Sequence, residues 1–114
     1  MVDIYGLKNC DTCRKALKWL QAEGLSHSFI DLRGDAGMDR ATVEQALADV
    51  GPDKLINRRG TTWRKLPETA RAATGSELTE LLLQQPALMK RPIFIDAAGA
   101  FVGFDAASQA RLKG

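Results

Sequence analysis

The segment over residues 2–20 constrains the fold of this chain more than any other, because it joins an extended run to a helix through a loop that carries a cysteine. Its first residues are β-branched or aromatic and predict a short buried strand, which Gly6 ends. Beyond Cys10, apolar residues recur at helical spacing and predict a helix over 11–23. Cys10 is therefore predicted at the N-terminus of this helix, with Cys13 one turn further in.

A thiol at such a position is predicted to be reactive. Unpaired backbone N–H groups and the positive end of the helix dipole favour an anion there, and the thiolate is the nucleophilic form of cysteine. Lys8 and Arg14 are expected to add positive charge and to lower the thiol pKa further. The predicted chemistry is attack by Cys10 on an oxidised sulfur or another electrophile, followed by attack of Cys13 to leave a Cys10–Cys13 disulfide.

Two other interpretations of the cysteine pair stay open. A zinc site needs two more ligands, for which the chain offers His27, its one histidine, and carboxylates. The pair could also be two small core residues, a role that suits Cys13 on the apolar side of the helix. A strand followed by a loop and a helix is the context that favours the redox interpretation.

Length and charge limit the classes of protein that fit. A chain of 114 residues forms one domain with a core of its own, and a net charge of +2 is too small to indicate nucleic-acid binding. No run reaches the ~18 apolar residues of a membrane span, and the N-terminus lacks the pattern of a signal peptide. We therefore expect a cytoplasmic protein with reduced thiols.

The remaining pattern predicts an α/β fold, a mixed sheet in the order βαβ…ββα with a helical insertion after the second strand, at about 38–86. The first βα unit is short, which implies parallel strands and a right-handed crossover. The expected elements are a strand over 25–32, a loop over 33–38, a helix over 40–50 capped by Asp39, a helix with a Thr74–Glu77 capping box ended by Pro86, a strand over 91–96, a turn over 97–100, a strand over 101–104 and a helix from Asp105 to about Leu112.

A basic loop over 58–65 and the pair Lys90-Arg91 form a second group of candidate residues. One interpretation is a solvated basic surface with Trp63 packed in the core. The other is an anion site beside Cys10 that uses Arg59 and Arg91.

Over essentially its whole length the chain resembles the arsenate-reductase-like (ArsC/Spx/YffB-type) branch of the thioredoxin superfamily. The segments that carry the resemblance are Ile4-Tyr5 through Cys10-Asp11-Thr12-Cys13-Arg14-Lys15-Ala16, Arg59-Gly60-Thr61-Thr62-Trp63-Arg64-Lys65-Leu66, Lys90-Arg91-Pro92-Ile93 and Val102-Gly103-Phe104. The second segment points to the YffB-type subgroup. The resemblance implies a thioredoxin-like core, a catalytic Cys10 and a cis peptide bond before Pro92.

The resemblance also bears on which substrate the site binds. Arsenate reductases of this type hold the oxyanion with three arginines. Arg91 matches the first of these arginines. Strict alignment puts Asn57, next to Arg58 and Arg59, at the second position, and Phe104 at the third. The phenylalanine argues against arsenate as the substrate. The position of Cys13 is a serine in those enzymes and a cysteine in Spx-type regulators.

The leading hypothesis is a thiol–disulfide reductase without a bound cofactor or metal. Glutathione is the expected co-substrate, or a glutaredoxin or thioredoxin the electron donor, with Lys8, Asn9, Arg59, Arg91 and Pro92 as binding residues. The alternative is an Spx-like regulator that binds RNA polymerase, with the cysteine pair as an oxidation switch.

Overall fold

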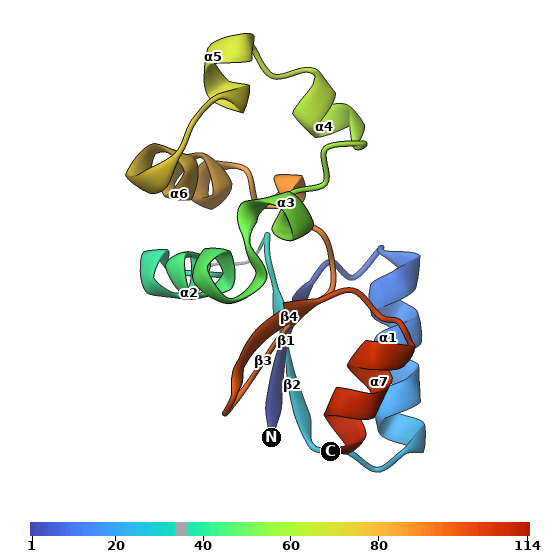
Figure 1. Ribbon diagram of the computed structural model, residues 1–114. Helices are drawn as coiled ribbons and strands as arrows, with labels where there is room; N and C mark the ends of the chain where they lie inside the picture. Colours follow the sequence, from blue (N-terminus) through green and yellow to red (C-terminus); the bar gives the residue numbers. More distant parts are fainter. Residues whose placement is uncertain (34–36) are drawn as a thin grey trace.

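A computed structural model describes residues 1–33 and 37–114, and its centre is a four-stranded sheet in the order β2-β1-β3-β4 (Figure 1). Strand β1 (Val2–Gly6) pairs in parallel with β2 (His27–Asp31), as predicted from the short βα unit, and antiparallel with β3 (Ile93–Asp96). Strand β4 (Gly99–Val102) pairs antiparallel with β3 at the other edge. The C-terminal ends of β1 and β2 therefore lie at the same end of the sheet as the start of β3.

Helices α1 (Asp11–Ala22) and α7 (Ala106–Lys113) cover one face of the sheet. On this face the buried side chains of β1 and β3 meet the apolar side of α1. Phe94 is fully buried and stacks on Phe101 of β4, with ring centroids 5.0 Å apart. The members of this core are Val2, Ile4, Ala16, Leu20 and Phe94. Alternation along β1 therefore fixes which of its residues meet α1.

The other face and one end of the sheet are covered by the segment between β2 and β3 (Figure 1). Its helices are α2 (Arg40–Val50), α3 (Pro52–Leu55), α4 (Thr61–Arg64), α5 (Glu68–Arg71), α6 (Gly75–Gln84) and the 3-10 turn η1 (Pro86–Leu88). Asp39 caps α2 through the backbone N–H of Thr42, as predicted. A second core joins this segment to the sheet and contains Trp63, which is buried.

Two details of the insertion differ from the prediction. The stretch after α2, which has no clear periodicity, folds into the single-turn helices α3, α4 and α5, which are too short to leave a repeating pattern in the sequence. Thr74 precedes α6 without a side-chain cap hydrogen bond, so the predicted Thr74–Glu77 capping box is wrong. The loop expected over 33–38 includes residues 34–36, which lie outside the described residues.

The second strand of the C-terminal hairpin begins two residues earlier than predicted, and the first begins two residues later. The Asp96 carboxylate accepts hydrogen bonds from the backbone N–H groups of Ala98 and Gly99, at 2.8 and 3.0 Å, and closes the turn there. Gly99, expected in the turn, starts β4 with a φ of 134°, which a glycine adopts readily. Phe104 therefore lies beyond the strand rather than at its end.

The mixed sheet with helices on both faces confirms the predicted thioredoxin-like class. None of the helices built from the described residues has the length and apolar character that crossing a membrane requires.

Candidate functional site

Cys10 is the N-cap residue of α1, the position predicted from the sequence. Its backbone is extended, with φ −92° and ψ 121°, and its carbonyl accepts from the N–H of Arg14 at 3.0 Å, the first bond of the helix. The turn before it is closed by the N–H of Cys10, which donates to the carbonyl of Leu7 at 3.1 Å. Cys10 is half-buried, and it lies at the head of the helix.

The pKa of Cys10 is lowered from its ordinary value. Burial raises this pKa, but the backbone N–H and thiol of Cys13, the backbone N–H of Thr12 and the Arg91 guanidinium together lower it more. Since the helix head has no conventional side-chain cap bond among the described residues, its free N–H groups act on the sulfur. The site therefore favours a thiolate at Cys10.

Cys13 has the opposite character. It is fully buried, and burial is the main cause that raises its pKa to about 11, with further contributions from the bond to Cys10 and the negative charge of Cys10. The backbone of Leu7 and the charge of Arg91 oppose this shift. The pair thus joins a thiol of lowered pKa to a thiol of raised pKa.

Gly6 makes room for the second cysteine. A Cβ on Gly6 would lie 2.5 Å from the Cys13 sulfur, closer than side-chain atoms approach one another. The absence of a side chain at the end of β1 therefore lets α1 pack with its second cysteine against the strand. Gly6 pairs with Asp31 as the last residue of β1, where the sequence suggested only a break.

Arg91 meets the cysteines from the segment that leads into β3. Its Nη1 donates to the carbonyls of Ala87 and Met89, at 2.9 and 3.2 Å, which fixes the guanidinium against η1. Its Nε is buried and has no hydrogen-bond partner among the described residues. The peptide bond between Arg91 and Pro92 is cis, as the resemblance implied, and Pro92 is buried.

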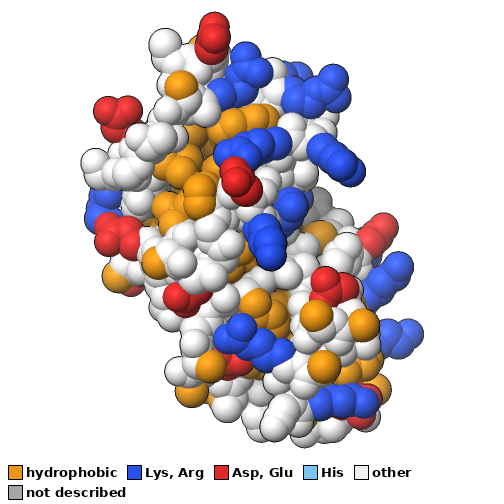
Figure 2. Space-filling model, in the orientation of Figure 1, with side chains coloured by type: hydrophobic (Ala, Val, Ile, Leu, Met, Phe, Trp, Pro, Cys, Tyr) orange, Lys and Arg blue, Asp and Glu red, His pale blue; other side chains and the backbone are white. Residues whose placement is uncertain are grey.

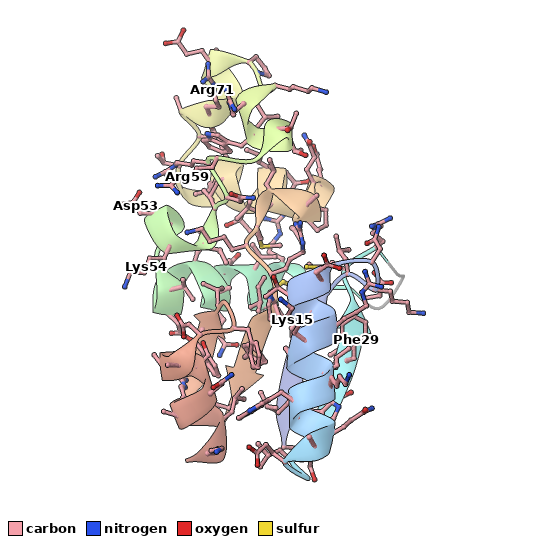
Figure 3. All side chains as sticks on the ribbon, turned by 90° about the vertical axis from the view of Figure 1, so that its right-hand side faces the viewer. Lys15, Phe29, Asp53, Lys54, Arg59 and Arg71 are labelled. Carbon is pink, nitrogen blue, oxygen red and sulfur yellow. The ribbon has the colours of Figure 1, made fainter. Side chains whose placement is uncertain are left out.

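Arg59 lies apart from this cluster. It is exposed in the turn between α3 and α4, and in the view of Figure 3 it projects to the left, away from the head of α1. No hydrogen bond or ion pair within the described ranges joins it to Cys10. Arg58, next to it, pairs with Asp53 at 2.6 Å.

Exposed basic side chains gather over the upper part of the molecule, around the insertion (Figure 2). The exposed basic residues of the insertion include Arg58, Arg64 and Lys65. The Trp63 ring is buried, with the Arg58 guanidinium 5.7 Å from its centroid. This arrangement agrees with the interpretation of the loop as a solvated basic surface over a core tryptophan.

The loop before Cys10 holds Lys8 and Asn9, both exposed. Asn9 Oδ1 accepts from Arg33 Nη2 at 2.8 Å, a contact that sequence analysis missed because the two residues lie far apart in the chain. The Arg14 guanidinium pairs with Asp11 at 2.8 Å. Neither Arg14 nor Lys8 is among the main groups that lower the Cys10 pKa, contrary to the prediction. Within the described part of the chain, no group of three or more His, Cys, Asp or Glu side chains could hold a metal ion.

Comparison with known proteins shows the family. The ArsC family model matches residues 5–112. An uncharacterised protein of Haemophilus influenzae is 41% identical over 106 residues, which cover 92% of either chain. A global transcriptional regulator Spx of Listeria innocua is 28% identical over 92% of this chain and 81% of its own. The solved structure titled YFFB (PA3664) protein is 34% identical, covers all of both chains and superposes with a TM-score of 0.89. With this coverage and identity, the chain belongs to the ArsC family.

Proposed function

We propose that this protein is a thiol–disulfide reductase in which Cys10 is the nucleophile and Cys13 the resolving cysteine. The observation that carries the proposal is the lowered pKa of Cys10 at the head of α1, where first-turn N–H groups and Arg91 act on one sulfur. Reductases of this kind need a thiolate, and this environment lowers the pKa of Cys10 in the direction that favours it.

The reaction balances with two thiols as reductant. The Cys10 thiolate attacks one sulfur of a disulfide, forms a mixed disulfide and expels the other sulfur as a thiolate. Cys13 then loses its proton and attacks the Cys10 sulfur, which releases the second substrate thiolate and leaves a Cys10–Cys13 disulfide. Two molecules of glutathione, or one dithiol protein such as a glutaredoxin or thioredoxin, reduce this disulfide and are oxidised.

The pKa of Cys13 should change in the direction that the second step requires. Two of the causes that raise its pKa, after burial, are the bond to Cys10 and the charge of Cys10. Both disappear when Cys10 enters a mixed disulfide, because the sulfur then carries no charge. Cys13 thus becomes easier to ionise at the stage when it must attack.

The co-substrate would bind at the end of the sheet around Cys10. Arg91 and Pro92 lead into β3 on one side of this position. Lys8 and Asn9 lie toward the other side, where Asn9 accepts a hydrogen bond from Arg33 just beyond β2. Arg59 would contact the outer part of a larger partner, such as a donor protein. A cytoplasmic location, where glutathione keeps thiols reduced, belongs to the same proposal.

Mass spectrometry of the Cys13→Ser variant with oxidised glutathione tests the proposal. The variant cannot resolve, so we expect one glutathione to accumulate on Cys10, while wild-type protein forms the intramolecular disulfide. Cys10→Ser is the matched control and should acquire no adduct under the same conditions. An adduct on neither variant, or alkylation of Cys10 with the pKa of free cysteine, would contradict the mechanism.

A redox-switched regulator is the second candidate, favoured by the Spx relative and the cysteine pair. Its oxidised form would bind RNA polymerase and its reduced form would not. Retention of purified polymerase on the immobilised protein, compared between oxidised and reduced samples and with Cys13→Ser, distinguishes the two. Strong retention that depends on oxidation would place this candidate first.

Arsenate reduction is expected to be negligible. The third arginine position of arsenate reductases is Phe104, whose ring packs edge-on against Trp19 with centroids 5.6 Å apart. An aromatic ring held there offers no bidentate contact to an oxyanion. Arsenate turnover with glutathione and a glutaredoxin should stay at the level of the Cys10→Ser variant.

A further inference from the structure

A small cavity of about 280 Å³ lies beside the loop that leads to Cys10, lined by Lys8, Asn9, Asp31 and Arg33. It sits where the parallel strands β1 and β2 end, next to the head of α1. Its lining combines two cationic side chains with one carboxylate. Lys8 and Asn9 are already proposed as binding residues, whereas Asp31 and Arg33 have no role in the proposal above.

Two hydrogen bonds fix the side chains that line the cavity, and three polar atoms of the lining take no part in them. Arg33 Nη2 donates to Asn9 Oδ1 at 2.8 Å, and the backbone N–H of Arg33 donates to Asp31 Oδ1 at 2.9 Å. The Lys8 Nζ, the Arg33 Nη1 and the Asp31 Oδ2 lie outside these bonds. The cavity therefore presents opposite charges from a loop tied to β2.

We propose that this cavity binds the head group of an α-amino acid, with its carboxylate at Lys8 and Arg33 and its ammonium at Asp31. A ligand with a carboxylate alone would gain from the two cations but would meet the negative charge of Asp31. A zwitterion with both charges on one carbon matches all three groups.

The inference rests on the proposed function, because it identifies which end of the thiol co-substrate enters the cavity. Glutathione carries an α-amino acid head group at its γ-glutamyl end, a thiol in the middle and a single carboxylate at its glycyl end. The cavity lies on the β2 side of β1, while Arg91 approaches from the β3 side. The γ-glutamyl end would thus enter the cavity, the sulfur would reach Cys10, and the glycyl carboxylate would point toward Arg91.

Binding of two unreactive ligands to the full chain tests the assignment. S-Methylglutathione keeps both charges of the head group, whereas N-acetyl-S-methylglutathione keeps the carboxylate and loses the ammonium. By titration calorimetry or NMR, we expect the wild-type protein to bind the first about tenfold more tightly, as one charge-assisted hydrogen bond is worth. Asp31→Asn keeps the oxygen that accepts from Arg33 and should abolish most of this preference.

Two further variants complete the design. Lys8→Gln should weaken both ligands alike, and Lys18→Gln, an exposed site further along α1, should change neither. Equal affinity for the two ligands in wild-type protein, an undiminished preference in Asp31→Asn, or no binding of S-methylglutathione would each overturn the proposal.

The failure of this inference can be told from a failure of the proposed function, because neither ligand can form a disulfide. Reaction of Cys10 with the uncharged hydroxyethyl disulfide measures the reductase chemistry separately. A reactive Cys10 without ligand preference refutes the cavity assignment alone, while an unreactive Cys10 refutes the reductase.

Discussion

Replacing Gly6 with alanine should force the second cysteine out of its place. The new Cβ would stand 2.5 Å from the Cys13 sulfur, roughly 1 Å inside ordinary van der Waals contact, while its distances to the Cys13 Cβ and the Phe29 ring are an acceptable 3.4 Å. Cys13 is fully buried, so its sulfur cannot swing into solvent. Strand and helix must separate locally.

The expected cost is that of overpacking a core, about 1–3 kcal/mol of unfolding free energy. Alanine in place of glycine in a strand returns roughly 0.5–1 kcal/mol by restricting the unfolded chain, so the net loss is about 1–2 kcal/mol. For a domain of this size the melting temperature should fall by about 4 °C for each kcal/mol.

A double-mutant cycle tests the cause of this loss. Cys13→Ala removes the sulfur, so Gly6→Ala in that background should be neutral or stabilising by up to about 1 kcal/mol. Cys13→Ala alone should cost about 1–2 kcal/mol for the space it empties. Urea unfolding followed by circular dichroism, with excess reductant present, measures all four proteins.

Equal cost of Gly6→Ala in both backgrounds would refute the reasoning, because it would mean that the contact with the sulfur is not what glycine avoids. In the wild-type background the variant should also resolve the Cys10–glutathione mixed disulfide more slowly. That rate, measured by mass spectrometry, reports the position of Cys13 independently of stability.

Three other changes have predicted outcomes. Arg91→Ala should raise the Cys10 pKa, measured as the midpoint of alkylation rate against pH, because it removes a hydrogen bond that favours the thiolate. Asp96→Asn should destabilise the protein at neutral pH and progressively less in acid. The hydrogen bond from Arg111 lowers the Asp96 pKa below 3.8 in the folded protein. The wild-type protein therefore has this stabilisation above pH 3.8 and loses it as the pH falls through the folded pKa. Asp49→Ala should cost about 1–2 kcal/mol in urea unfolding, because its carboxylate accepts a backbone N–H of the edge strand β4 at 2.9 Å.

These expectations have matched controls. Lys18→Ala should leave the alkylation midpoint unchanged, and Glu44→Ala, exposed on the same helix as Asp49, should leave stability unchanged. A Cys10 pKa insensitive to Arg91, a wild-type advantage over Asp96→Asn that is as large in acid as at neutral pH, or an Asp49 variant as stable as the wild type would contradict the respective arguments.

The sequence predicted the parts of the fold that local chemistry dictates. Apolar periodicity over 11–23 placed the first helix within a residue of its observed end, and the change from strand to helix placed Cys10 at its head. The parallel pairing of β1 and β2 followed from the short connection between them. Asp39 and Asp105 marked the starts of two helices because aspartate satisfies first-turn N–H groups.

Other parts depend on contacts that no local pattern records. The hairpin register follows from the bonds of Asp96 within the turn and of Asp49 to Ala100, 51 residues away. The bond between Arg33 and Asn9 spans 24 residues, and the need for glycine at position 6 appears only when α1 is laid on β1. Arg14 was misjudged because its partner, Asp11, stands one turn earlier on the same helix.

The two carbonyls that hold Arg91 belong to the last turn of the insertion, and a bridge between Ile56 and Met89 ties that turn to the helices before it. The lowered pKa of Cys10 therefore depends on folded helices that are remote from it in sequence. A change that displaces this turn would remove the two carbonyls that hold the Arg91 guanidinium, and the pKa of Cys10 would then rise.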